Sequence, residues 1–210
     1  MKRLSEAESL DGLPVPSKQF HVEGPVSPGG LSGLRMNEQL QNFRLPEKQH
    51  QALIKIAGFA IGMVFVAVHA GEIVGYITFH RPDEYARWYR HPRVLELGGI
   101  EVARSWRRCG VGTDMLRAAF SLEVFEQWIV ITTEYFRHWD VKGNNMTVWQ
   151  YRELLTKLFG RVGFVERATS DPDIIEHPAN VLMARCGSRV SWDDMMLFEQ
   201  LLMEKVRWKR

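Results

Sequence analysis

Two glycines separated by one residue follow a pair of arginines in the stretch RRCGVGT, residues 107–113. A strand-like apolar run precedes this stretch, and an apolar run with helical spacing follows it. The first N–H groups of a helix have no carbonyl partner inside the helix, and they lie at the positive end of its dipole. Glycine lets the main chain approach a ligand where a Cβ atom would collide. The stretch therefore predicts a phosphate-binding loop.

Two common phosphate-binding motifs do not fit this loop. A P-loop requires a lysine directly after its last glycine, where this chain has Thr113. A dinucleotide-binding fingerprint requires a third glycine, where this chain has Met115. The pattern that remains is strand, R-x-x-G-x-G, helix. The alternative to a ligand site is a glycine-rich turn that serves only to pack the strand against the helix.

This pattern resembles the acyl-CoA loop of the GNAT superfamily of N-acyltransferases, in which a branched apolar residue precedes [QR]-x-x-G-x-[GA]. Val102 stands at that position, five residues before Arg107. The resemblance implies acetyl-CoA as co-substrate, and no His/Cys spacing indicates a metal site. The residues expected to hold the co-substrate are Ile100, Val102, Arg107, Arg108, Cys109, Gly110, Val111, Gly112 and Thr113.

Longer segments resemble one branch of that superfamily, the acetoin-utilisation acetyltransferases of Gram-positive bacteria. The resemblance covers roughly residues 20–190 and includes ELGGIEVARSWRRCGVG, TTEYFRHWDVKG and HPANVLMARCG. It implies a protein acetyltransferase that modifies the active-site lysine of acetyl-CoA synthetase and thereby inactivates it. Two alternatives are a GNAT enzyme that acetylates a small amine and a non-catalytic module that senses acyl-CoA.

A lysine ε-amine must lose a proton before it can attack a thioester, because at pH 7 only about one in a few thousand is neutral. GNAT proteins commonly use a glutamate on the strand before the loop, and this strand carries Glu96 and Glu101. The two have opposite parity, so in a regular strand they face opposite sides of the sheet, although a bulge at Gly98 and Gly99 would change that. We favour Glu101 as the base over Glu96. The alternative for either is an ion-paired structural carboxylate.

The departing coenzyme A thiolate needs a proton, which a tyrosine on the late helix supplies in many GNAT proteins. That tyrosine usually stands four residues before a Gly-Phe pair, where this chain has Phe159. Tyr151 and Tyr135 are the substitutes, and the alternative for both is a packed tyrosine with a satisfied hydroxyl. Arginine and aromatic residues between the strands, and a cluster after a later strand, are candidates for contacting a protein substrate: Trp88, Arg90, His138 and Trp139. His138 and Asp140 form a further candidate pair that would orient a base or cap a turn.

Alternating strand and helix patterns position these residues. We expect strands at residues 20–26, 63–70, 72–80, 95–103, 127–135, 163–168 and 180–186, and helices at 46–58, 110–122, 147–158 and 191–208. Their order resembles the GNAT fold, an α/β (α+β) architecture in which a mixed, mostly antiparallel sheet has helices on both faces and splayed central strands. We expect a flexible tail at residues 1–19, an acetyltransferase domain at 20–190, and a C-terminal helix at 191–210 packed on or extending the domain.

The composition indicates the general class of protein and argues against nucleic-acid binding and membrane binding. The 210 residues are 45% hydrophobic and 25% charged, as in an ordinary globular protein. The formal charge of +2 supplies no broad field for binding nucleic acid or an anionic membrane. Two cysteines, Cys109 and Cys186, are too few for a disulfide framework, which favours a reducing cytoplasm. The longest uncharged run, residues 57–71, is too short to span a bilayer.

Overall fold

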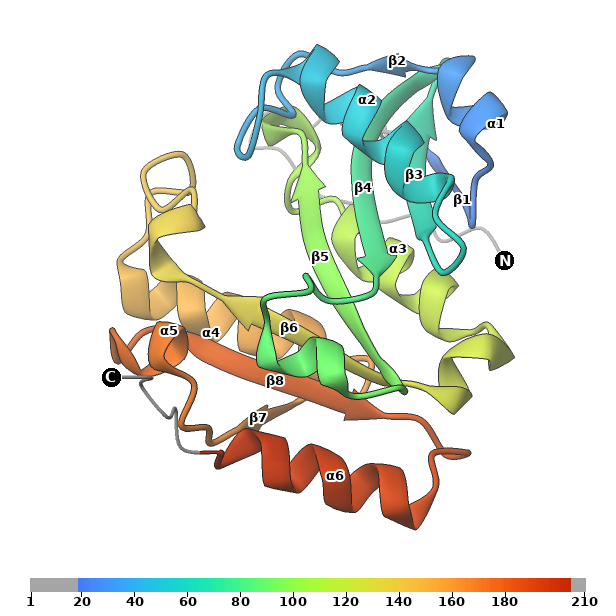
Figure 1. Ribbon diagram of the computed structural model, residues 1–210. Coiled ribbons are helices and arrows are strands. Elements are labelled where there is room, and N and C mark those ends of the chain that lie inside the picture. The colour runs from blue at the N-terminus through green and yellow to red at the C-terminus, as the bar shows by residue number, and fades with distance from the viewer. Residues whose placement is uncertain (1–18, 205–210) are drawn as a thin grey trace.

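The computed structural model describes residues 19–204, so most of the expected tail and residues 205–210 lie outside the described residues. The C-terminal helix ends at Leu202, before the expected residue 208. Within them, eight strands form one sheet in the order β1-β3-β4-β5-β6-β8-β7, with β2 paired to β4 (Figure 1). The β5–β6 and β2–β4 pairs are parallel and the others are antiparallel. The expected mixed, mostly antiparallel sheet is therefore confirmed. The strands are β1 His21–Glu23, β2 Arg35–Met36, β3 Met63–His69, β4 Glu72–His80, β5 Val94–Val102, β6 Ile129–Glu134, β7 Val165–Arg167 and β8 Val181–Cys186.

Helices cover both faces of this sheet (Figure 1). In Figure 1, α2 lies in front of β3 and β4 while α3 lies behind them, and both helices contact these strands. The helices are α1 Pro28–Ser32, α2 Pro46–Ala57, α3 Val111–Phe120, α4 Val148–Gly160, α5 Pro172–Ile175 and α6 Trp192–Leu202, with short 3-10 helices η1 Arg87–Arg90, η2 Arg104–Trp106, η3 Glu123–Gln127 and η4 Phe136–His138.

Local sequence explains where several elements begin and end. Ala70 and Gly71 join β3 to β4 with φ angles of 48° and 75°, which suits the tight turn of a hairpin. The Thr147 side chain accepts a hydrogen bond from Gln150 N, and the Gln150 side chain accepts one from Thr147 N, which caps α4. Ser191 caps α6 in the same way through the Asp194 N–H. The first strand is shorter than the expected 20–26, because Pro25 has no N–H to donate.

A bulge in β5 decides which way its glutamates face. Thr78 pairs with Gly99 and Phe79 with Leu97, so Gly98 is an extra residue in the register. Glu101 pairs with Tyr76 and Glu96 with His80, and Tyr76 and His80 share one face of β4. The bulge therefore brings Glu96 and Glu101 to the same face, although their parity in the sequence is opposite.

The central strands splay apart, as expected from the resemblance. β5 and β6 pair only over three residues each, from Val94–Ile129 to Glu96–Ile131. Beyond this point the two strands diverge in Figure 1. Among the described residues, the backbone of β5 from Leu97 onward pairs with no residue of β6. Unpaired backbone groups of a strand can bind an extended ligand.

Candidate functional site

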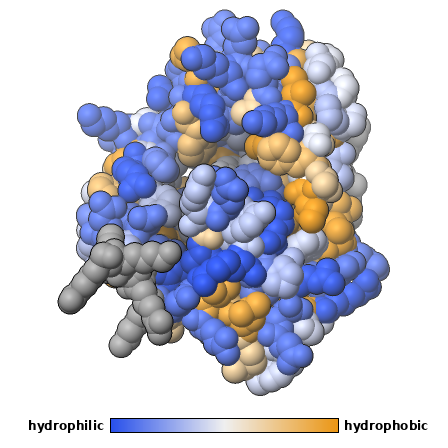
Figure 2. Space-filling model, in the orientation of Figure 1, coloured by the Kyte–Doolittle hydropathy of each residue, from blue (hydrophilic) through white to orange (hydrophobic). Residues whose placement is uncertain are grey.

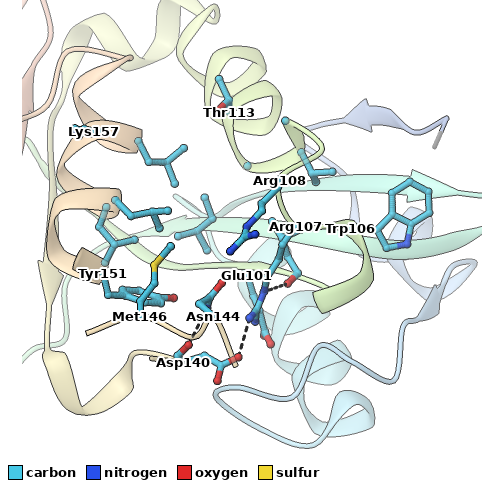
Figure 3. Close-up of a pocket in the computed structure, with 18 of the residues that line it drawn as sticks. Glu101, Trp106, Arg107, Arg108, Thr113, Asp140, Asn144, Met146, Tyr151 and Lys157 are labelled. Carbon is cyan, nitrogen blue, oxygen red and sulfur yellow. Dashed lines mark hydrogen bonds and ion pairs between the residues drawn. The ribbon is translucent and has the colours of Figure 1, made fainter. Parts of the chain in front are cut away.

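A cavity of about 510 Å³ opens where the central strands diverge. The end of β5, the first turn of α3, the loop after β6 and one side of α4 form its walls (Figure 3). Of the residues expected to hold the co-substrate, all except Cys109 line it: Ile100, Val102, Arg107, Arg108, Gly110, Val111, Gly112 and Thr113. The structure therefore brings these residues together around one space. Cys109 is exposed outside the lining.

The loop before α3 lines this cavity at Arg108 and Gly110. Arg108 and Gly110 have positive φ angles of 64° and 85°, and the chain then enters α3 at Val111. A Cβ atom on Gly112 would lie 3.8 Å from Ile100 Cδ1 and from Val102 Cγ2, which places this glycine against the apolar end of β5. The arrangement suits an anion at the helix N-terminus, with an apolar chain running along β5.

Arg107 holds two walls of the cavity together. Its Nη1 atom lies 2.8 Å from Asp140 Oδ2, and its Nε donates to Val102 O at 3.2 Å. Arg104 also pairs with Asp140, at 3.4 Å. Burial acts to raise the pKa of Asp140, but hydrogen bonds from Arg107 and Gly143 outweigh it, and the pKa lies below its usual range. Asp140 thus pairs with Arg104 and Arg107, whereas the ring of its candidate partner His138 packs against Tyr135.

Glu101 of β5 lines the cavity and is 5% exposed. Its Oε1 atom accepts a hydrogen bond from Asn42 N at 2.8 Å, and its Oε2 accepts one from the Tyr76 hydroxyl at 2.8 Å. Burial raises the pKa of this carboxyl, while the hydrogen bonds and the charge of Arg107 act in the opposite direction. A carboxylate with a raised pKa and a fixed orientation is suited to accept a proton near neutral pH.

Glu96, the other candidate base, lies on the same face but does not line the cavity. The Thr133 hydroxyl donates a long hydrogen bond of 3.4 Å to Glu96 Oε1. Burial raises the pKa of Glu96, and the neighbouring His80 lowers it in part. The two glutamates are therefore in different surroundings, with Glu101 at the cavity and Glu96 beside Ile131 and Thr133 of β6.

The two candidate tyrosines are also separated. Tyr151 lines the cavity, and its ring stacks on Trp139 with centroids 5.4 Å apart. Burial raises the pKa of the Tyr151 hydroxyl, with Arg107 acting against this shift. Tyr135 packs instead against the buried cluster that contains Trp88 and Phe198, with the Arg137 guanidinium over its ring, and it does not line the cavity. The structure thus brings Tyr151, and not Tyr135, to the cavity.

The candidate protein-contacting residues do not form one surface. Trp88 is only 3% exposed and packs against Phe198 of α6, so its prediction as a substrate-binding residue is wrong: its ring fills the core. Trp139 is 9% exposed and lies under Tyr151. Arg90 is exposed and pairs with Glu204, and His138 is exposed beside Tyr135.

Sequence reasoning missed Asn42, Tyr76 and the role of Asp140. Asn42 lies in the loop between β2 and α2, 59 residues before Glu101, and its backbone N–H makes the contact, so no side-chain signal marks it. Tyr76 reads as an ordinary apolar position of β4, and only the register shows that it faces Glu101. Among residues 19–204, no group of three or more His, Cys, Asp or Glu could hold a metal ion. No helix in that range is long and apolar enough to cross a membrane.

Comparisons with known proteins agree with this geometry. A family model described as the acetyltransferase (GNAT) family matches residues 34–145. The acetoin utilization protein AcuA of Bacillus subtilis is 43% identical over 182 residues, which cover 86% of this chain and 87% of AcuA. The crystal structure of an acetoin utilization protein from Exiguobacterium sibiricum superposes with a TM-score of 0.85 at 37% identity, covering 89% of this chain and 95% of that one.

A more distant solved structure shares the fold. It is a GNAT superfamily phosphinothricin acetyltransferase from Sinorhizobium meliloti in complex with AcCoA, with a TM-score of 0.53 at 14% identity. The match covers 82% of this chain and 90% of that one. At this identity the likeness concerns the arrangement of strands and helices alone.

Proposed function

This chain belongs to the GNAT family of acetyltransferases and is of the AcuA type, and from that premise we propose that it transfers an acetyl group from acetyl-CoA to the active-site lysine of acetyl-CoA synthetase. Acetylation removes the positive charge of the lysine and inactivates the synthetase. We place the enzyme in the cytoplasm, where acetyl-CoA is made and consumed. The substrate assignment rests on the resemblance to the acetoin-utilisation acetyltransferases.

One observation carries the proposal: a single cavity joins the loop before α3 to the carboxylate of Glu101. In our proposal, the pyrophosphate of acetyl-CoA binds the backbone N–H groups around Gly110 and Gly112, at the start of α3. The pantetheine arm then extends along Ile100 and Val102, where β5 has no partner on its β6 side. This path ends with the thioester beside Glu101.

The proposed chemistry requires three proton transfers. Glu101 accepts a proton from the lysine ammonium, directly or through a water molecule, and the neutral nitrogen then attacks the thioester carbonyl carbon. The C–N bond forms, the C–S bond breaks, and the electron pair leaves with the sulfur of coenzyme A. The nitrogen, which is positively charged after the attack, loses its second proton to water and becomes the amide N–H. We assign protonation of the thiolate to Tyr151, because Tyr151 lines the same cavity. Glu96 and Tyr135 are the alternatives for the two roles.

The decisive experiment incubates the protein with acetyl-CoA labelled in its acetyl group and a purified, folded acetyl-CoA synthetase. The label is expected on one lysine of the synthetase, located by mass spectrometry, together with loss of synthetase activity. Substitution of that lysine by arginine should abolish both effects. Transfer to spermidine or an aminoglycoside but not to the synthetase would support the small-amine alternative. Binding of acetyl-CoA with transfer to none of them would indicate a sensor.

A further inference from the structure

Asn42 connects β5 to the segment that follows β6, across the opening between the two strands. Its backbone N–H donates to Glu101 Oε1 of β5, and its Nδ2 atom donates to His138 O of η4, both at 2.8 Å. Among residues 19–204, β5 and β6 share no backbone pair beyond Glu96 and Ile131. Asn42 is therefore a bridge at a place where the strands themselves no longer pair, and one end of this bridge is the proposed base.

A second bridge crosses the same opening and holds the segment to which Asn42 is attached. Arg107 donates to Val102 O of β5 at 3.2 Å and pairs at 2.8 Å with Asp140, two residues after His138 (Figure 3). The Gly143 N–H also donates to Asp140, at 2.9 Å. The segment after β6 is thus held in place, which makes the His138 carbonyl oxygen a fixed acceptor.

The loop of residues 37–45, between β2 and α2, carries Asn42. Leu40 is fully buried, but residues 41–45 are all exposed. On the face of the molecule seen in Figure 2, polar surface surrounds scattered apolar groups. An exposed segment buries little apolar surface, so its position depends on its hydrogen bonds. The side-chain bond of Asn42 is therefore expected to decide where the backbone of residues 41–45 lies.

The same loop acts on the charge of Glu101. Burial raises the pKa of this carboxyl, and the backbone N–H groups of Asn42 and Gln41 act to lower it, together with the Tyr76 hydroxyl and the charge of Arg107. Tyr76 belongs to a central strand and is 1% exposed, whereas Gln41 and Asn42 belong to an exposed loop. The contribution of the loop can therefore be lost while the sheet stays intact.

We propose that Asn42 is a positioning residue for the proposed base, because its side-chain bond to His138 O holds backbone N–H groups of the loop against the Glu101 carboxylate. Fixed donors around a carboxylate stabilise its charge and its orientation. A side chain that does not reach His138 O releases the loop from η4, and water then replaces these donors in part. The inference rests on the proposed function for the role of Glu101 as base, whereas the hold on its carboxylate does not depend on that role.

The test titrates Glu101 directly and needs no substrate. The protein is labelled with glutamate that carries carbon-13 at its side-chain carboxyl, and the NMR resonance of Glu101 is identified by its absence in Glu101→Gln. Its titration midpoint is measured in the unchanged protein, Asn42→Ala, Asn42→Ser and Asn37→Ala. Asn37 is the matched control: it begins the same loop, and its Nδ2 atom donates at 2.8 Å to Glu72 Oε2, and neither residue lines the cavity.

For Asn42→Ala and Asn42→Ser, we expect the midpoint of Glu101 to move upward by about one pH unit, or about tenfold in proton affinity, because donors to the ionised form are loosened. Asn37→Ala should leave the midpoint unchanged. An unmoved midpoint in the Asn42 variants, or an equal move in Asn37→Ala, overturns the proposal. Should the alanine variant of Asn42 not fold, the serine variant decides alone. A moved midpoint in a protein that labels no acetyl-CoA synthetase would support the positioning role and refute the proposed function.

Discussion

Tyr76 and Glu101 lie opposite each other in the register of β4 and β5, and the Tyr76 hydroxyl donates a 2.8 Å hydrogen bond to Glu101 Oε2. The backbone N–H of Asn42 donates to the other oxygen at the same distance. Both bonds favour the ionised carboxylate, whereas burial favours the protonated form and raises the pKa. Glu101 is therefore a carboxylate with fixed oxygens and opposing influences on its pKa, which is the condition for a base that works near neutrality.

Replacing Glu101 by glutamine tests its role as base. Glu101→Gln keeps the shape of the side chain and removes the proton acceptor, so we expect turnover to fall by about 10²–10⁴-fold. The Kd for acetyl-CoA should hardly change, because the phosphate loop is intact. Steady-state kinetics and calorimetry measure the two effects. Full activity of Glu101→Gln combined with loss in Glu96→Gln would transfer the role to Glu96.

Removing the Tyr76 hydroxyl should shift the pH dependence of the reaction. In the proposed mechanism the reaction requires ionised Glu101, so we expect kcat/KM to rise with pH through the pKa of this carboxyl. The hydrogen bond from Tyr76 lowers that pKa, and its loss in Tyr76→Phe must raise the pKa further. The acidic limb of the profile should therefore move to higher pH, with activity recovering as the pH is raised. An unmoved limb would show that a different group controls it.

A side chain at Gly112 should block the acyl donor. A Cβ atom added at Gly112 would lie 3.8–3.9 Å from Ile100, Val102 and Leu158, which all line the cavity, so the branches of Gly112→Val would reduce the space there. We expect the Kd for acetyl-CoA to rise at least about tenfold, or about 1.4 kcal/mol. Gly160→Val on α4 is the control, because a Cβ there meets nothing within 4 Å. Equal acetyl-CoA affinity in folded Gly112→Val would contradict the assignment of the site.

Loss of the Asp140 carboxylate should destabilise the fold. Asp140→Asn removes charged hydrogen bonds to partly buried Arg107, so we expect the free energy of unfolding to fall by about 1–3 kcal/mol. The pKa of Asp140 is depressed in the fold, so this stabilisation is present above the unfolded pKa of about 3.9 and is lost as pH falls through the lower folded pKa. Urea unfolding measures both effects.

The free energy of unfolding should differ between Asp140→Asn and the unchanged protein by a constant amount above about pH 5. This difference should shrink below about pH 4. The control is Glu84→Gln, which alters an exposed carboxylate and should change stability little. A difference that persists undiminished to low pH would mean that the charge of Asp140 is not its source.

The sequence predicted which residues between the end of β5 and the start of α3 lie around the cavity, because these residues are close together in the chain. Gly110, Gly112 and the strand before them are contiguous, and the apolar spacing of α3 marks where the helix begins. The splay and the mixed sheet came from the resemblance. Each hairpin turn and each helix cap is also formed by residues that are close in the sequence, as at Ala70 for the turn and Thr147 for the cap.

The surroundings of Glu96, Glu101 and Trp88 depend on contacts between residues that are far apart in the sequence. The periodicity of the sequence does not predict such contacts. The glycines of β5 suggested a bulge that would change the facing of Glu96 and Glu101, but only the pairing of β5 with β4 shows that the bulge is present, at Gly98. Trp88 stands among arginines in an interrupted stretch and reads as a surface residue. It is buried because α6, more than a hundred residues later, covers it with Phe198.

The final prediction concerns the size of the acceptor: a folded acetyl-CoA synthetase should be modified far better than a short peptide carrying the same lysine. The segment between β4 and β5 supports this expectation. Arg81 donates to Val94 O at 2.7 Å and to Tyr89 O at 2.8 Å, which fixes the segment before any partner binds. Tyr85 is 90% and Tyr89 47% exposed there. Fixed, exposed tyrosines are typical of residues that contribute strongly to protein–protein binding.

Contacts of this kind, remote from the reacting atoms, can orient the lysine at the thioester, so a peptide that lacks them loses rate as well as affinity. Changing Tyr85 and Tyr89 together to alanine should lower kcat/KM for the synthetase by about tenfold or more and leave kcat/KM for the peptide unchanged. Initial rates with both acceptors, and with spermidine and an aminoglycoside as small-amine controls, measure this difference. Comparable values for peptide and synthetase in the unchanged protein would contradict recognition by docking. An equal loss with both acceptors in the double variant would place the tyrosines in the fold and not in the interface.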